Sequence, residues 1–472
     1  MRFLVIPLAT WILSLPLPST VYATEMDPQT LDDFLLASLE RTRFPTLSVA
    51  IVTSDKTLYS RSLVRPGLDV SVDGETPYFL GSISKSLTAT LTLRLVEAGK
   101  LDLDARLVDY LSMQGKDVEA ITVRHLLMQT SGFSAGFSHD LRAFKGDIGH
   151  LKLKASPGSH YEYSSVNYVL LGMIIEAATG LRLAEAMDEY LFTPLNMTNS
   201  SAGMTVQPGN SLVEGFTYFF GAVLPWENPK LGRFAAPMGY LISSRNDMAR
   251  FVQAHLSGTF LTPATQEAML MDDPNMNGRY GMGWFITRWG DERAFYHAGM
   301  TATSGGFVFV LPESDLGIVL LTNVNSGALF PATLDIVRGV IAISKGNRAE
   351  SVFPKEWLFH LVVGLGSAVG IVQLVRRGRR WMKAGRPMGG FASRKAVLSF
   401  AIDFAAPIAL FLVIRLVFEI PLLALLHVTP DLGIAVVLSF ITAWGSGILK
   451  VFTTPVPAAS RFSDGDQLAR GG

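Results

Sequence analysis

The pattern of apolar and polar positions has two different periods at the start of the chain. Residues 26–43 repeat apolar side chains at helical spacing. The next segment, TLSVAIVTSDKTLYSRSLV, alternates apolar and polar residues around a turn at 54–56. Far along the chain, GGFVFVLPESDLGIVLLTNV has the pattern of a second hairpin, with its turn at 312–317. We therefore expect a helix followed by a hairpin at one end of this region, and a second hairpin at the other.

The segment between the hairpins has mostly helical spacing. Helices are expected at 84–99, 123–128, 168–178, 183–191 and 246–256. Hairpins at both ends that enclose helices predict an antiparallel sheet built from the two ends, with a helical subdomain inserted between them. The expected fold class is therefore α+β.

The C-terminal quarter has a different pattern. Three apolar stretches of membrane-spanning length lie at about 357–375, 396–418 and 432–451. The segment between the first two, RRGRRWMKAGRPMGGFASRK, carries eight basic residues and no acidic one. Such a segment could bind nucleic acid, but between two apolar spans it is a topology signal that favours a cytoplasmic loop. We expect residues 351–472 to form a membrane domain with three transmembrane helices and a cytoplasmic C-terminus.

Ionisable residues occur within these stretches. Asp403 and Arg415 fall in the second span and His360 near the outer end of the first. Intramembrane charges are candidates for function, although Arg415 could also extend its side chain to the membrane surface. The sequence leaves the roles of these three residues open.

The N-terminus has the pattern of a secretory signal. Residues 1–23 contain Arg2, an apolar run interrupted by two prolines, and a small-residue cleavage pattern that ends at Ala23. An uncleaved anchor is the alternative, but the apolar run is short for a span. Cleavage would leave residues 24–350 as an exported domain. The orientation predicts that this exported domain lies in the bacterial periplasm, or on the extracellular face, attached to the inner membrane.

Charge and cysteine content limit the possible functions. Residues 24–356 carry 27 basic and 35 acidic side chains, so the neutral total hides an acidic exported part without the basic stripe of a nucleic-acid binder. The chain has no cysteine, which excludes disulfides, thiolate catalysis and cysteine-based zinc sites. The eight histidines show no metal-ligand spacing and there is no HExxH motif, so we expect neither a metal nor a cofactor.

The stretch GSISKSLTAT, residues 81–90, combines three serines with one lysine at an expected helix start. Ser82 lies at or just inside the helix N-terminus, where the dipole and free N–H groups favour an oxyanion. Lys85, three residues later, shares its face of the helix. A lysine desolvated beside a serine can act as its base. Ordinary capping by Ser82 or Ser84, with Lys85 on the surface, is the alternative.

Further segments accompany this motif in a fixed order. They are TVRHLLMQTSGF (122–133), HYEYSSVNYVLLGMIIE (160–176), FTPLNMT (192–198), PMGYLISSRNDMARF (237–251), YGMGWF (280–285) and HAGMTATSGGFVFVLPES (297–314). Together they resemble the beta-lactamase and penicillin-binding-protein-like serine hydrolases of the class C type over residues 30–340. SxxK motifs of this kind are known from relatives of that group.

The resemblance implies a role for each matching residue. Ser82 would be the acylated nucleophile and Lys85 its partner, while Tyr163 would activate the serine and then water, with a phenol pKa lowered by the lysine. Backbone N–H groups of Ser82 and Met300 would form the oxyanion hole. His297 and Gly299, in a strand motif that often reads Lys-Thr-Gly in relatives, would contact the substrate. His297 could instead be a packing histidine.

Two departures from the family pattern bear on the substrate. Ser165 stands where the family usually has an asparagine, and His297 replaces a cation that many relatives use to bind the ligand carboxylate. Both weaken the case for an antibiotic-hydrolysing enzyme. A shorter side chain at Ser165 leaves room for a substrate that brings its own amide group.

The whole architecture resembles a narrower group, the membrane-bound peptidases that mature nonribosomal peptide prodrugs, of the colibactin-maturing type. That resemblance implies removal of an N-acyl-D-asparagine cap from an acylated peptide or peptide–polyketide substrate, with membrane lipid as the other partner. The alternatives are a beta-lactamase, DD-carboxypeptidase or esterase of the same fold. A beta-lactam sensor is disfavoured, because the expected cytoplasmic parts leave no room for a signalling domain.

Overall fold

The structure is a computed structural model of the chain. It describes residues 26–113, 118–134, 153–203, 211–228, 232–271, 280–325, 332–353, 355–384 and 430–453, with scattered positions between 398 and 412. Two compact units are present. The first comprises Met1–His360 with His427–Thr429, and the second comprises Leu361–Leu426 with Pro430–Gly472.

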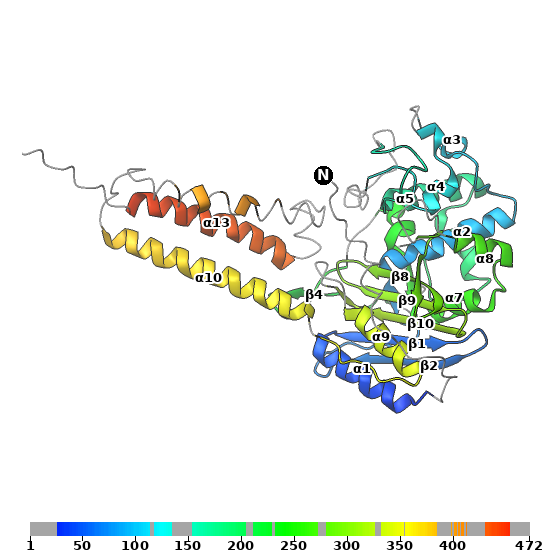
Figure 1. Cartoon of the computed structure of the whole chain (residues 1–472), viewed down its shortest axis with the longest axis horizontal. Helices are drawn as coiled ribbons and strands as arrows, with labels where there is room; N and C mark the ends of the chain where they lie inside the picture. The colour runs from blue at the N-terminus through cyan, green and yellow to red at the C-terminus, as the bar shows by residue number, and fades with distance from the viewer. Residues whose placement is uncertain are drawn as a thin grey trace, which may run out of the picture. The chain divides into compact units, whose positions relative to one another are not determined.

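A six-stranded antiparallel sheet forms the centre of the first unit (Figure 1). Its strand order is β2-β1-β10-β9-β8-β7. The N-terminal hairpin joins the C-terminal strands where β1 pairs with β10, so that Val49 lies opposite Leu320. This confirms the predicted α+β fold with a sheet built from both ends of the domain. The bounds are β1 Thr46–Val52, β2 Thr57–Val64, β7 Phe285–Trp289, β8 Glu292–Met300, β9 Gly305–Leu311 and β10 Leu316–Thr322.

Helices cover both faces of this sheet. The helices α1, Pro28–Thr42, and α9, Ala332–Ser344, contribute to a hydrophobic core on one face, together with Val49 of β1. Ala50 of the same strand belongs to the core on the other face, which contains the inserted helices. Every residue of β1 is therefore buried, whereas the sequence suggested apolar–polar alternation. The polar Ser48 is satisfied inside by a hydrogen bond with the Tyr78 hydroxyl.

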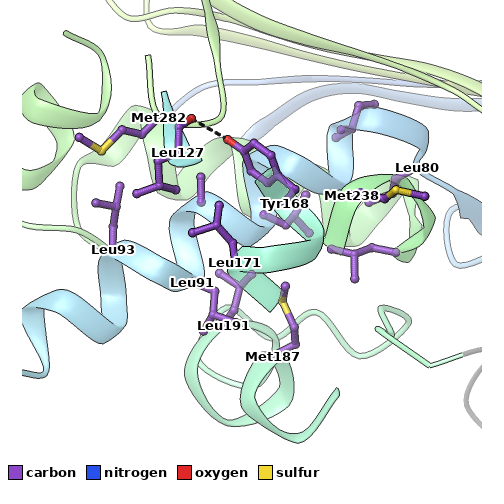
Figure 2. Packing of buried hydrophobic residues seen from close by; sticks show 14 of the residues in the cluster. Leu80, Leu91, Leu93, Leu127, Tyr168, Leu171, Met187, Leu191, Met238 and Met282 are labelled. Carbon is purple, nitrogen blue, oxygen red and sulfur yellow. Dashed lines mark hydrogen bonds between the residues drawn. The ribbon is translucent and has the colours of Figure 1, made fainter. Parts of the chain in front are cut away.

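The inserted subdomain contains the helices that the sequence predicted. Figure 2 shows Leu91, Leu171 and Leu191 grouped together in this core. The Tyr168 hydroxyl donates to the Leu127 carbonyl oxygen at 3.0 Å. Burying a leucine side chain stabilises the fold by roughly 1.5–3 kcal/mol. The helices are α2 Ser84–Glu97, α3 Leu107–Tyr110, α4 Val123–Leu127, α5 Ser165–Thr179, α6 Leu183–Met187, α7 Arg245–Ser257 and α8 Pro263–Met269. Short 3₁₀-helices are η2 Gly81–Ile83, η3 Val118–Ala120 and η7 Arg233–Ala235, and short π-helices are η6 Asp188–Phe192 and η8 Ala236–Tyr240.

Two small sheets were not predicted from the sequence. One has the order β11-β4-β5 and the other pairs β3 with β6. Their strands are β3 Pro77–Phe79, β4 Phe216–Phe219, β5 Ala222–Pro225, β6 Ile242–Ser244 and β11 Val324–Asn325. The β3–β6 pair connects the chain just before η2 to the chain just before α7, so it helps to fix the start of α2.

In the part of the chain that the structure describes, two helices are long and apolar enough to cross a membrane. They are α10, Lys355–Ala384, and α13, Pro430–Thr453, each with an apolar window of mean hydropathy 2.0. They include two of the three predicted spans. The predicted span 396–418, with Arg415, lies mostly outside the described residues, as do residues 1–23. The basic segment that was expected to be a loop is helical as far as Ala384, because α10 continues through it.

The two helices of the second unit pack through small residues. A Cβ added to Gly370 would lie 3.2 Å from the Thr442 hydroxyl oxygen, and one added to Gly445 would lie 2.9 Å from a methyl carbon of Leu374. Small side chains at such positions let two helix backbones approach closely.

Candidate active site

The three serines of GSISKSLTAT have different environments. Ser82 lies in the short turn η2 and is half-buried, whereas Ser84 and Ser86 are buried in the first turn of α2. The Ser84 hydroxyl accepts a hydrogen bond from the Leu241 N–H at 3.0 Å, and the Ser86 hydroxyl donates to the Gly283 carbonyl oxygen at 2.7 Å. The Ser84 and Ser86 hydroxyls are therefore engaged by backbone groups, and Ser82 is the serine of this stretch that can act as a nucleophile.

Lys85 is completely buried beside Ser82. Its side-chain nitrogen lies 3.2 Å from the Ser82 hydroxyl oxygen, as the three-residue spacing predicted. The same nitrogen donates to the Met238 carbonyl oxygen of η8. Burial lowers the pKa of Lys85 to about 7, since an ammonium group loses its hydration inside the protein. No ion pair of Lys85 offsets this loss among the described residues, so near neutral pH much of Lys85 is a free amine.

Tyr163 completes the cluster from the other side. Its ring centroid lies 5.0 Å from the Lys85 nitrogen, and its hydroxyl is hydrogen-bonded to Ser82. Burial raises the pKa of Tyr163, and the hydrogen bond to Ser82 offsets only part of that rise. The expectation of a lowered phenol pKa is therefore wrong for the free protein. The physical reason is that burial removes water from the phenolate, which costs more than the hydrogen bond to Ser82 returns, so Lys85 is the better proton acceptor.

The end of β8 approaches η2 with direct backbone contact. Gly81 has a φ of 56°, and a Cβ there would lie 2.1 Å from the Met300 backbone nitrogen. A Cβ on Gly299 would lie 1.9 Å from the Leu80 carbonyl oxygen. Any side chain at either position would separate the two segments. This approach supports the predicted oxyanion hole, because it brings the Met300 N–H beside the turn that carries Ser82.

His297 is buried, and both of its ring nitrogens are engaged. Nδ1 donates to the Ala298 carbonyl oxygen at 2.8 Å, and Nε2 lies 3.2 Å from the Tyr280 hydroxyl. Burial and the nearby Lys85 lower the pKa of His297 to about 3, so the imidazole is neutral and Nε2 accepts the Tyr280 proton. The histidine is thus held in place by its neighbours. A direct contact between His297 and substrate stays a prediction.

Tyr280 is the residue whose role the sequence did not reveal. It belongs to the YGMGWF segment, but nothing in that segment predicts a partner for its hydroxyl. Its ring packs edge-to-face on Tyr163, with centroids 6.0 Å apart, and also edge-to-face on His297 at 5.9 Å. Tyr280 therefore links the tyrosine beside Ser82 to the strand that carries Met300.

Ser165 lies two residues after Tyr163 and is the first residue of α5. It is half-buried, and its hydroxyl has no hydrogen-bond partner among the described residues. The turn before it is held by Gln129, whose side-chain oxygen accepts from the Ser164 N–H at 2.9 Å and from the buried Asn167 amide at 2.5 Å. These contacts fix the backbone on which Tyr163 and Ser165 stand, and they leave the Ser165 hydroxyl available to a ligand.

One edge of β8 beside the cluster can accept an extended ligand. The pairing of β8 with β7 ends at Tyr296, opposite Phe285, while its pairing with β9 continues to Met300. Residues 297–300 thus have a strand partner on one side only in the described part of the chain. An unpaired strand edge can bind the backbone of a peptide-like ligand by adding a strand.

Within the part of the chain that the structure describes, no group of three or more histidine, aspartate and glutamate side chains is placed to hold a metal ion. A buried amine next to a serine, with backbone N–H groups nearby, is an arrangement suited to acyl transfer through a serine ester.

Comparison with known proteins gives the class to which this fold and site belong. Residues 31–340 match the beta-lactamase family. Protein flp of Staphylococcus aureus (strain N315) is 26% identical over 329 residues, which cover 64% of this chain and 64% of that protein. The octameric penicillin-binding protein homologue of Pyrococcus abyssi has a TM-score of 0.60 at 24% identity, covering 77% of this chain and 83% of the other. A D-stereospecific amidohydrolase of Streptomyces has a TM-score of 0.53 at 21% identity, covering 63% and 94%.

These matches identify a serine hydrolase fold, and the family match extends over more than half of the sequence. The chain belongs to the beta-lactamase family. It spans about 64% of the length of the staphylococcal relative, so the activity of that whole protein is not transferred to it.

Proposed function

We propose that this chain is a membrane-anchored serine amidase with its catalytic domain outside the cytoplasm. The observation that carries the proposal is the 3.2 Å approach of the buried Lys85 nitrogen to the Ser82 hydroxyl. Membrane anchoring rests on α10 and α13, whose apolar windows are long enough to cross a bilayer.

The reaction follows from the positions of these groups. The neutral amine of Lys85 accepts the proton of Ser82 while the serine oxygen attacks the substrate carbonyl carbon. Backbone N–H groups of Ser82 and Met300 stabilise the negative charge on the former carbonyl oxygen. The leaving amine then takes a proton, relayed from Lys85 through Tyr163, and departs. Water attacks the resulting ester by the same sequence, which frees Ser82.

For the substrate, we propose an amide whose acyl group is an N-acyl-D-asparagine, as in the caps of self-protected peptide prodrugs. Ser165 supports this choice, because its free hydroxyl stands where relatives carry an asparagine and leaves space for the substrate's own amide. The neutral His297 also supports it, since no fixed cation is present at this position to attract a carboxylate. An enzyme whose name specifies D-stereospecific amide hydrolysis shares the fold.

The test compares three substrates with the full-length protein in detergent or vesicles. They are an N-acyl-D-asparagine amide, its L-epimer and a chromogenic cephalosporin. We expect the D-epimer to be cleaved preferentially, and the Ser82→Ala variant to be inactive on all three. Equal cleavage of both epimers, or turnover of the cephalosporin alone, would reject the prodrug substrate in favour of a beta-lactamase, carboxypeptidase or esterase activity.

The Ser165→Asn variant tests the pocket argument separately. It restores the family residue and fills the space that we assign to the substrate side chain. We expect KM for the D-asparagine amide to rise while the hydrolysis of a small acyl ester changes little. An unchanged KM would show that Ser165 does not contact the asparagine group, even if Ser82 is the nucleophile.

A further inference from the structure

The hairpin formed by β4 and β5 brings two exposed and two half-buried large apolar side chains together. Leu224 of the edge strand β5 is 42% exposed, and Trp226, which directly follows that strand, is 37% exposed. Phe219 and Phe220 are half-buried at the tip. The two phenylalanine rings pack edge-to-face with centroids 4.8 Å apart. Clustered exposed apolar residues on one element mark a surface that contacts something other than water.

The turn of this hairpin carries backbone strain at an aromatic residue. Phe220 has a φ of 48° and Gly221 a φ of 87°, which is the pattern of a tight two-residue turn. Asparagine, aspartate or glycine is usual at the first of these positions, because a bulky side chain is disfavoured in the left-handed region. A phenylalanine held in this conformation places its ring at the tip, and strain of this kind is common at functional positions.

The tip of the hairpin is bonded to the start of α10 through Arg43. The guanidinium of Arg43 donates to the Gly221 carbonyl oxygen at 2.9 Å and lies 3.8 Å from the centroid of the Trp357 ring. The Trp357 indole N–H donates to the Arg41 carbonyl oxygen at 2.9 Å. All of these residues belong to the first unit, so the hairpin and the first turn of α10 form one body.

The body of the hairpin is held to the same place. The Tyr218 ring stacks on His360 with centroids 5.4 Å apart and planes 6° apart. The Tyr218 hydroxyl donates to the Thr42 carbonyl oxygen at 2.6 Å. The aromatic hairpin therefore lies beside the point at which the apolar stretch Trp357–Lys383 begins. Tryptophan and other aromatic residues are enriched at this level of membrane helices.

We propose that the β4–β5 hairpin contacts the lipid bilayer that α10 enters, with Phe219, Phe220, Leu224 and Trp226 inserted at the headgroup level. This proposal rests on the membrane anchoring in the proposed function. It adds a second point of attachment, so that the catalytic unit has a fixed orientation at the membrane surface. An enzyme so oriented presents its site to substrates that carry an acyl chain in the bilayer.

The bilayer is favoured over other occupants by continuity. Within the first unit, the hairpin contacts the first turn of α10, where the apolar stretch Trp357–Lys383 begins. The exposed side chains of the hairpin are of the kind found in the aromatic belts of membrane proteins. A second copy of the chain, or the helices of the second unit, would instead cover the hairpin with protein. The experiment below separates these cases.

The absence of cysteine allows single-cysteine labelling of the full-length protein. Phe220→Cys and Leu224→Cys each receive an environment-sensitive fluorophore, and the protein is reconstituted into vesicles of phosphatidylcholine and phosphatidylglycerol. Quenching is measured with lipids that carry a nitroxide at a shallow or at a deep acyl position and, separately, with aqueous iodide. Leu58→Cys is the matched control, since Leu58 is 39% exposed at the end of β2 away from Arg65, which contacts Arg43. A fluorophore at Val369→Cys, on α10, reports whether that helix is in the bilayer.

We expect the shallow nitroxide to quench both hairpin positions, the deep nitroxide to quench Val369, and neither to quench Leu58. Quenching at Val369 without quenching at the hairpin would overturn the hairpin proposal and leave the anchoring intact. Protection from iodide without quenching by lipid would show a protein partner and would also overturn it. If Val369 is not quenched either, both the anchoring and the hairpin contact fail, whereas amide hydrolysis by Ser82 is unaffected by that result.

Discussion

The Lys85 nitrogen lies 3.2 Å from the Ser82 hydroxyl oxygen and also donates to the Met238 carbonyl oxygen. The second contact comes from η8, far along the chain, and it fixes the direction of an otherwise flexible lysine. With one N–H committed to a carbonyl, the lone pair of the neutral amine can accept the serine proton. The base is therefore positioned before substrate arrives, which lowers the reorganisation needed in the reaction.

The first prediction concerns pH. Burial lowers the pKa of Lys85 to about 7, and only the neutral amine can accept the Ser82 proton. We expect kcat/KM to rise as pH increases through about 7 and then to level off, so activity is lost on the acidic side. Steady-state rates between about pH 5 and pH 9 test this. A rate that still rises without a plateau at pH 9 would contradict this role of Lys85 and point to a base of higher pKa, such as Tyr163.

Ser84→Ala separates structure from chemistry in the serine cluster. The substitution removes the acceptor of the buried Leu241 N–H, so we expect the free energy of unfolding to fall by about 1–3 kcal/mol. Turnover per folded molecule should remain close to that of the wild type. Thermal or urea unfolding measures the first effect and active-site titration the second. Loss of turnover in a folded Ser84→Ala protein would contradict the assignment of Ser82.

Tyr280→Phe tests the support of His297. The variant deletes the hydroxyl that donates to Nε2 and leaves that buried nitrogen without its partner. We expect kcat/KM to fall about tenfold, the equivalent of about 1.4 kcal/mol. The low-pH limb should also change, because an imidazole freed of this donor is easier to protonate.

Tyr296→Phe is the control for that variant. Tyr296 precedes His297 on β8, and its side chain lies in the core that contains α1 and α9. Its hydroxyl makes no hydrogen bond to any of the described residues. Its loss should leave kinetics unchanged. Equal effects of the two substitutions would show that the Tyr280 hydroxyl contributes only general packing.

Phe220→Asn should stabilise the hairpin turn. Asparagine tolerates the left-handed conformation that Phe220 adopts, so we expect the free energy of unfolding in detergent to rise by about 1 kcal/mol. Phe219→Asn is the matched control, since it removes the neighbouring ring from a strand position without relieving strain, and it should not stabilise. A loss of stability in Phe220→Asn as large as in Phe219→Asn would mean that ring packing outweighs backbone strain.

The part of the site that depends on local spacing was predictable from the sequence. Ser82 and Lys85 lie on one face because three residues make nearly one helical turn, and the structure confirms the contact. The role of Tyr163 came from the family resemblance, and its hydrogen bond to Ser82 agrees with that position. Its pKa could not be foreseen, because the direction depends on how deeply Lys85 is buried.

Long-range partners were beyond sequence reasoning. Met238 and Tyr280 reach the site from segments separated from Lys85 by well over a hundred residues, and no periodicity reports such pairs. The YGMGWF segment is recognisable as a motif, but nothing in it indicates that the Tyr280 hydroxyl contacts His297. The β4–β5 hairpin is not predictable for another reason: the pair Phe220–Gly221 lacks the asparagine or aspartate that usually signals a two-residue turn.

The central claim, that Ser82 alone of the three serines is the nucleophile and that Lys85 activates it, is tested most directly by covalent labelling. The full-length protein is treated with a fluorophosphonate, which phosphonylates activated serines, and the modified residue is located by peptide mass spectrometry. We predict an adduct on Ser82 that persists in Ser84→Ala and Ser86→Ala, disappears in Ser82→Ala and forms far more slowly in Lys85→Met. An adduct on Ser84 or Ser86, or undiminished labelling of folded Ser82→Ala, would contradict the account.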